Sequence, residues 1–153
     1  MEKRLNHRQV SPQAQQAIGP IYAYVKECGL DIGLVDMIWL RISQINGCAY
    51  CVDLHYRDAL AHGVPARKLN SVVTWAETAF FTARERAALA WAESLTLVAA
   101  THAPDEIYRA AHEQFSDKEL VDLSWAIALM NAMNRMGVGF RLQPDVKPEE
   151  RGQ

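Results

Sequence analysis

The sequence predicts an all-α protein, and three observations lead to this prediction. Glycine is sparse, with 8 glycines in 153 residues, whereas alanine and leucine are abundant. No alternation of apolar and polar residues persists long enough to indicate a strand. Helix start signals recur instead, the clearest being the capping boxes that begin at Thr82 and Ser116. We therefore expect one domain, residues 1–153, built from seven or eight helices.

Glycine and proline divide the first half of the chain into helices. Ser11-Pro12 is typical of a helix start, because proline is well tolerated at the first helical position. This helix should end near residue 18, where Gly19-Pro20 is expected to break it. Further helices are expected at about residues 21–28, 33–45, 48–62 and 66–78.

The second half carries the two capping boxes. The box at Thr82 begins a long helix, and Pro104 begins another that ends near residue 115. The box at Ser116 begins the last helix, which runs to about residue 140 and is apolar nearly all round. We expect this helix to be buried on several sides, partly at an oligomer interface. Residues 144–153 are expected to form a solvated tail.

Charge and composition exclude several classes of protein. The formal net charge is −2 and no long basic run occurs, which argues against nucleic-acid binding. No apolar run approaches the ~18 residues that a membrane span needs. Residues 1–8 are charged and lack a following apolar segment, so they do not form a secretory signal. Three cysteines, an odd number, do not suggest a secreted disulfide scaffold. We expect a cytoplasmic protein without membrane contact.

The chemistry of the chain is concentrated in one stretch around Asn46-Gly47. Two thiols, Cys48 and Cys51, are three residues apart, and His55 follows four residues after the second. On a helix, all three side chains fall within about 60° of one face. Asn46-Gly47 should end one helix, which places both cysteines in the first turn of the next. Free amides and the helix dipole there favour a thiolate.

Other interpretations of this stretch remain open at this point. Two buried structural cysteines beside a surface histidine form the simplest alternative. A zinc site with two thiolates and one imidazole is another, but Asp36 or His102 would have to supply the fourth ligand. Covalent haem is excluded because it needs CxxCH, and position 52 is valine.

The same stretch resembles the core motif of the alkylhydroperoxidase D-like (AhpD-like) branch of the carboxymuconolactone decarboxylase family. The resemblance covers roughly residues 30–141. The segments that carry it are LRISQINGCAYCVDLH (40–55), ERAALAW (85–91), HAPD (102–105) and NAMNR (131–135). The motif is specific to the thiol branch, because the decarboxylase branch generally lacks the paired cysteines.

The resemblance implies an all-helical fold, trimers or hexamers, and chemistry without a cofactor or metal. It makes Cys51 the peroxidatic thiol and Cys48 the resolving residue and proton donor. His55 would relay protons together with a carboxylate twelve residues before the first cysteine. That position holds Asp36 where the family has glutamate. The missing methylene shortens the reach by about 1.5 Å, so a bridging water is expected if the direct hydrogen bond fails.

Two further residues are weaker candidates for the site. Glu77 matches the carboxylate of a Trp-Arg-Glu segment found in relatives, although the arginine is missing here. His102 precedes Pro104, and a structural role is expected for it. Tyr50 stands where some members of the family carry an extra histidine.

The function that follows from these residues is a thiol peroxidase for small alkyl hydroperoxides. An external dithiol would restore the cysteine pair, and in the best-understood branch of the family this donor is a protein-bound lipoamide. A non-catalytic redox sensor or adaptor with a reversible Cys48–Cys51 disulfide is the main alternative. A decarboxylase of lactone substrates is a third, and it predicts that the cysteines are dispensable.

Overall fold

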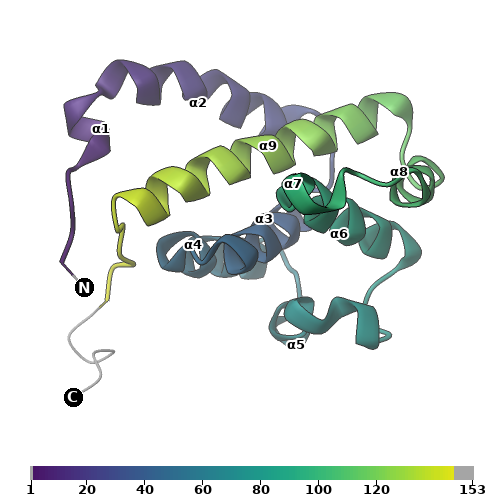
Figure 1. Ribbon diagram of the computed structural model, residues 1–153. Coiled ribbons are helices and arrows are strands. Elements are labelled where there is room, and N and C mark those ends of the chain that lie inside the picture. The colour runs from purple at the N-terminus through teal and green to yellow at the C-terminus, as the bar shows by residue number, and fades with distance from the viewer. Residues whose placement is uncertain (1, 147–153) are drawn as a thin grey trace.

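The computed structural model describes residues 2–146, and all regular elements in this range are helices (Figure 1). In chain order they are α1 (His7–Val10), α2 (Pro12–Glu27), α3 (Ile32–Asn46), α4 (Ala49–Ala61), α5 (Ala66–Asn70), the 3-10 helix η1 (Val72–Glu77), α6 (Ala83–Thr96), α7 (Val98–Thr101), α8 (Asp105–His112) and α9 (Asp117–Gly139). The all-α prediction is confirmed. None of the described helices is both long and apolar enough to cross a bilayer.

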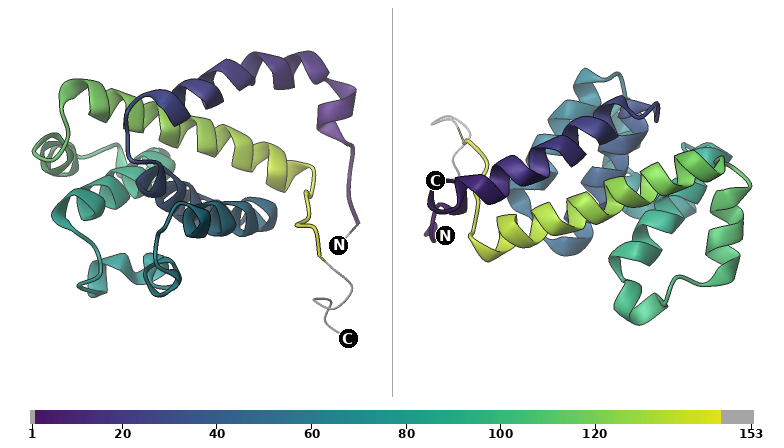
Figure 2. Two further views of the ribbon diagram at one scale, coloured as in Figure 1. Left: turned by 180° about the vertical axis from the view of Figure 1, so that it is seen from behind. Right: turned by 90° about the horizontal axis from the view of Figure 1, so that it is seen from above.

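Helix α3 is the centre of the hydrophobic core. Every residue from 33 to 40 is buried, and α4, α6 and α9 all pack against α3. Helix α9 runs between α2 on one side and α3 with α4 on the other (Figures 1 and 2). The indole of Trp39 on α3 donates a hydrogen bond of 2.9 Å to the carbonyl of Ala126 on α9. This buried bond fixes the two helices that carry the site between them.

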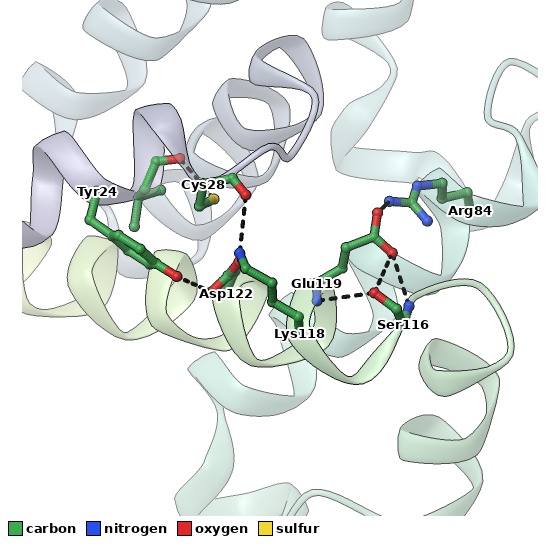
Figure 3. A network of polar contacts seen from close by, with 8 residues as sticks. Tyr24, Cys28, Arg84, Ser116, Lys118, Glu119 and Asp122 are labelled. Carbon is green, nitrogen blue, oxygen red and sulfur yellow. Dashed lines mark hydrogen bonds and ion pairs between the residues drawn. The ribbon is translucent and has the colours of Figure 1, made fainter.

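A capping box fixes the start of α9, as the sequence predicts. Ser116 accepts from the amide of Glu119, and the Glu119 carboxylate accepts from the amide of Ser116 at 2.9 Å (Figure 3). Arg84 on α6 donates to the same carboxylate at 2.7 Å. The backbone hydrogen bond from Ser116, together with Arg84, lowers the pKa of Glu119 to about 2. The charged carboxylate therefore joins the starts of α6 and α9.

A second group of contacts joins α9 to α2. The Tyr24 hydroxyl donates to Asp122 at 2.8 Å, and the Lys118 ammonium donates to Asp122 at 2.6 Å (Figure 3). Lys118 also donates to the carbonyl of Cys28, at the end of α2. Asp122 is 3% exposed, so its charge is compensated inside the protein by these donors.

The N-terminal segment packs against the C-terminal end of α9 (Figure 1). The guanidinium of Arg4 donates to the carbonyl of Gly139 at 2.8 Å. The ring of His7 stacks on Phe140 with 5.2 Å between the centroids. These contacts hold α1 and the start of α2 beside the C-terminal end of α9, where they cover one side of the site described below.

The prediction that a helix ends at Gly19-Pro20 is wrong. Helix α2 is continuous through both residues, and Pro20 lies inside it. Proline removes one helical hydrogen bond, but both residues are exposed and water can bond the freed carbonyl. Residues 21–28 are therefore the second half of α2 and not a separate helix.

Two other boundaries also differ from the expected ones. The helix expected over 66–78 is divided at Ser71 into α5 and η1, where the backbone of Thr74 is not helical. The long helix that begins at Thr82 ends at Thr96, and a short separate α7 follows. The tail prediction for 144–153 falls mainly on residues 147–153, which lie outside the described residues.

Candidate active site

Cys48 and Cys51 form a disulfide at the start of α4, with 5.3 Å between their Cα atoms. Gly47 ends α3 in the left-handed conformation at φ 71°, which glycine adopts without strain. Cys48 follows as the N-cap residue of α4, and Cys51 lies in its first turn. The prediction that Asn46-Gly47 separates two helices is confirmed. Both sulfurs stand where free helix amides stabilise a thiolate once the disulfide is reduced.

The two cysteines differ in their surroundings. A cavity of about 250 Å³ is lined by Cys51 and His55 from α4, together with residues of α1, α2 and α9. Cys48 does not line this cavity. It packs against Gly137 of α9 so closely that a Cβ at position 137 would lie 2.6 Å from the Cys48 sulfur. A molecule in the cavity therefore meets the sulfur of Cys51 and not that of Cys48.

Most of the cavity wall is apolar. Its apolar residues are Ile18 and Tyr22 from α2, Leu54 from α4, Leu129, Met130 and Met133 from α9, and Leu142 after α9. His7, Arg8 and Gln15 add polar groups from the N-terminal segment. Burial, followed by the charge of Arg8, lowers the pKa of His7. The cavity thus presents an apolar body with polar groups on one wall, a combination that suits a small organic molecule.

His55 is held rigidly on α4. Its side chain is 2% exposed, and its ring lies 5.1 Å from that of Trp39. Nδ1 faces Asp36 Oδ1 at 3.8 Å, which is too long for a hydrogen bond, and neither atom has another partner. The shorter side chain of aspartate accounts for this gap. The other ring nitrogen, Nε2, points away from Asp36.

The other oxygen of Asp36 binds a residue that the sequence interpretation left out of the site. His62 Nδ1 donates to Asp36 Oδ2 at 2.6 Å, and Asp36 itself is fully buried. His62 follows His55 by seven residues, about two turns, and is the C-cap residue of α4. That spacing is the signal in the sequence that could have placed it near the site.

An amide network supports the disulfide from the side of α9. Asn46 donates to the side-chain oxygens of both Asn131 and Asn134, each at 3.0 Å. Asn134 donates in turn to Ser43 at 3.0 Å. These bonds join the end of α3 to α9 beside Cys48, so they fix the turn that positions the cysteine pair.

The weaker candidates lie away from this site. Glu77 is exposed in η1, and His102 is exposed where α7 ends. Neither residue lines the cavity. Cys28, the remaining thiol, is half-buried, and its sulfur contacts the carbonyl of Val25 at 3.2 Å.

A metal does not fit the charges around Asp36 well. Asp36, His55 and Asp58 each place one potential ligand atom within 4.8 Å of the others. However, Asp36 already binds His62, and both carboxylates interact electrostatically with the charge of Lys26. Burial lowers the pKa of Lys26, but a hydrogen bond to Tyr22 and the charges of Asp36 and Asp58 outweigh this effect and raise it. The protein itself compensates these carboxylates, and we assign no metal site here.

Comparisons with known proteins agree with this geometry. The sequence pattern of the carboxymuconolactone decarboxylase family matches residues 12–94. The chain is 30% identical over 140 residues to YdfG, an uncharacterised protein of Bacillus subtilis, covering 92% of this chain and 95% of YdfG.

Two solved structures extend the comparison. A protein of unknown function from Agrobacterium tumefaciens, named as a candidate antioxidant defence protein AhpD, is 38% identical and has a TM-score of 0.93; the match covers 95% of this chain and all of that one. An uncharacterised peroxidase-related protein from Ralstonia eutropha with an alkylhydroperoxidase AhpD core is 23% identical, with a TM-score of 0.79 over 90% of this chain and 74% of that one, and it supports the fold alone. This chain therefore belongs to the AhpD-like branch of the carboxymuconolactone decarboxylase family.

Proposed function

We propose that this protein is a thiol peroxidase that reduces small organic hydroperoxides. The observation that carries the proposal is the asymmetry of the cysteine pair, in which Cys51 meets the cavity with His55 while Cys48 stays behind it. A peroxidatic thiol must reach the substrate, whereas a resolving thiol needs only to reach its partner. The largely apolar wall favours an alkyl hydroperoxide over hydrogen peroxide.

The reaction begins with the reduced pair. His55 takes the proton of Cys51, and the thiolate attacks the terminal oxygen of the hydroperoxide. The O–O bond breaks, Cys51 becomes a sulfenic acid, and the alkoxide leaves as an alcohol after taking up one proton. The Cys48 thiol then attacks the Cys51 sulfur and releases water, which closes the disulfide. Two thiols and one hydroperoxide thus give one disulfide, one alcohol and one water.

An external dithiol returns the enzyme to its reduced state by thiol–disulfide exchange. Since Cys51 is the sulfur that meets the cavity, the donor should enter by the same route as the peroxide. A protein-bound lipoamide, the donor implied by the family, has a slender apolar arm that suits such a passage. We further propose a homo-oligomer, trimer or hexamer, because Val121 and Trp125 leave apolar surface exposed on α9.

Steady-state turnover with cumene hydroperoxide and dihydrolipoamide tests the proposal. Cys51→Ser should abolish turnover, and Cys48→Ser should leave a sulfenic acid that dimedone labels at Cys51. Cys28→Ser is the matched control, because Cys28 lies outside the cavity and should be dispensable. Labelling at Cys48 in the Cys51→Ser variant would reverse the two roles.

The same assay separates the alternative functions. A wild-type rate no higher than that of free dihydrolipoamide would refute the peroxidase and favour a redox sensor. A lactone decarboxylase would keep its activity when both Cys48 and Cys51 are replaced by serine.

A further inference from the structure

His62 and His55 contact opposite sides of one buried carboxylate. Asp36 projects from α3 between the two imidazoles of α4, with Oδ2 at 2.6 Å from His62 and Oδ1 at 3.8 Å from His55. The Asp36 and His55 side chains are 1% and 2% exposed, whereas that of His62 is 37% exposed. The three side chains therefore form a row that leads from the cavity to the surface of the protein.

We propose that His62 connects the Asp36–His55 pair to solvent and that protons of the thiol chemistry enter and leave through it. The proposal rests on the proposed function, since it supplies protons to the same cysteine pair. His62 is a positioning residue in this scheme, because it acts through Asp36 and touches neither substrate nor sulfur.

The reaction needs such a connection because its proton steps are separated in time. Ionisation of Cys51 releases one proton before the hydroperoxide reacts, and the departing alkoxide takes one up afterwards. No net proton is consumed, but a proton must be held or exchanged in between. A substrate that fills the apolar cavity would exclude water from Cys51, so exchange through the cavity is blocked when it is needed.

The row offers a separate path on the other side of His55. The 3.8 Å between His55 Nδ1 and Asp36 Oδ1 is only about 0.6 Å beyond the range of a direct hydrogen bond, so a small rotation of either side chain lets a proton pass between them. Asp36 Oδ2 is in direct contact with His62 Nδ1. Imidazole can then exchange the proton with solvent from its other nitrogen.

Capping of α4 does not explain the His62 side chain. The end of α4 is already satisfied by backbone bonds, because the amide of His62 donates to the carbonyls of Asp58 and Leu60. The surface around His62 also carries Asp31, Lys68 and Glu85. Lys68 and Glu85 pair with each other, and the Asp31 side chain caps α3, so neither acid competes with Asp36 for His62. On the inner side, Asp58 places a carboxylate oxygen within 4.8 Å of Asp36, and the charge of Asp36 raises the pKa of Lys26.

The variant that tests the proposal is His62→Asn. The asparagine amide nitrogen stands where the histidine Nδ1 stood, so it can keep the hydrogen bond to Asp36 but cannot carry a proton. His112→Gln is the matched control, because His112 makes a similar 2.8 Å bond to Asp117 through Nε2 at a position remote from the cavity. Two rates are measured for each protein: turnover of cumene hydroperoxide, and reduction of the Cys48–Cys51 disulfide by dithiothreitol.

We expect kcat to fall about ten-fold or more in His62→Asn, with KM for the peroxide unchanged. This loss is smaller than the roughly 10²–10⁴-fold that a direct acid–base group contributes, because His62 acts through Asp36. Added imidazole or a higher buffer concentration should restore much of the rate in this variant and should not affect the wild type. Equal kcat in His62→Asn and wild type, or a loss that buffer does not restore, would overturn the proposal.

The disulfide-reduction rate keeps this proposal separate from the peroxidase itself. If the wild type does not turn over peroxide, the proposed function fails, but thiol–disulfide exchange still needs protons at the leaving sulfur. In that case, slow and buffer-dependent reduction of the disulfide in His62→Asn supports the proton path. Reduction of the His62→Asn disulfide at the same rate as in the wild type refutes it.

Discussion

Replacing Gly137 by alanine should destabilise the oxidised protein selectively. The added Cβ would lie 2.6 Å from the Cys48 sulfur and 3.5 Å from the Cys51 sulfur. An ordinary contact is about 3.6 Å, so the first distance is short by about 1 Å. Overpacking of this kind costs about 1–3 kcal/mol. Alanine in place of glycine inside a helix returns about 1 kcal/mol through its better propensity.

The two redox states should respond differently to this substitution. In the disulfide the Cys48 sulfur is fixed and must take the overlap, whereas a free thiol can rotate away. The oxidised form is therefore disfavoured by about 1–3 kcal/mol relative to the reduced form, and the disulfide should become about 20–65 mV more oxidising. Redox titration against glutathione measures this shift directly, and thermal unfolding with and without dithiothreitol provides an independent measure.

Gly139→Ala is the control, because it lies in the same helix and no atom of the described residues lies within 4 Å of its Cβ position. It should leave the potential unchanged. If Gly137→Ala also leaves the potential unchanged, or lowers Tm equally in both redox states, then Gly137 does not pack on the disulfide and the reasoning is refuted.

Three other predictions concern charged groups. Asp36→Asn should slow turnover about ten-fold or more, whereas Asp53→Asn, at an exposed ion pair on α4, should have no effect in the same assay. The pKa of Glu119 is lowered from 4.5 to about 2, so its charge stabilises the fold above pH 4.5, and this contribution is lost as the pH falls towards 2. Glu119→Gln should flatten the pH dependence of Tm in that range. The pKa of His7 is lowered below 6.5, so the unfolded chain binds more protons, and docking of α1 should weaken as the pH falls through 6.5. Hydrogen exchange of α1 and α2 should show this weakening, and His7→Phe should abolish it.

The sequence predicted the parts of the site that depend on local spacing. Cys48, Cys51 and His55 lie within two turns, so helix geometry alone places them together. The capping boxes at Thr82 and Ser116 were equally predictable, because each is complete within four residues. Such features need no knowledge of the tertiary fold.

Most of the missed features depend on the tertiary structure, that is, on contacts between distant segments or on exposure. Nothing near Gly137 indicates that its missing side chain makes room for a sulfur 89 positions earlier in the chain. The continuous α2 was missed for a related reason, since tolerance of Pro20 depends on exposure, which local sequence does not encode. His7 reaches the cavity only because the N-terminal segment docks on the end of α9.

The presence of aspartate at position 36 and of histidine at position 62 can be explained together. A glutamate, as in the family motif, would extend one methylene further and could close the 3.8 Å gap to His55 by direct contact. Aspartate stops short of His55, and its second oxygen instead lies against His62 at 2.6 Å. His62 therefore compensates a buried charge that His55 alone would leave unpaired. If this is correct, relatives with glutamate at the position of Asp36 have no need of histidine at the position of His62, and relatives with aspartate should retain it.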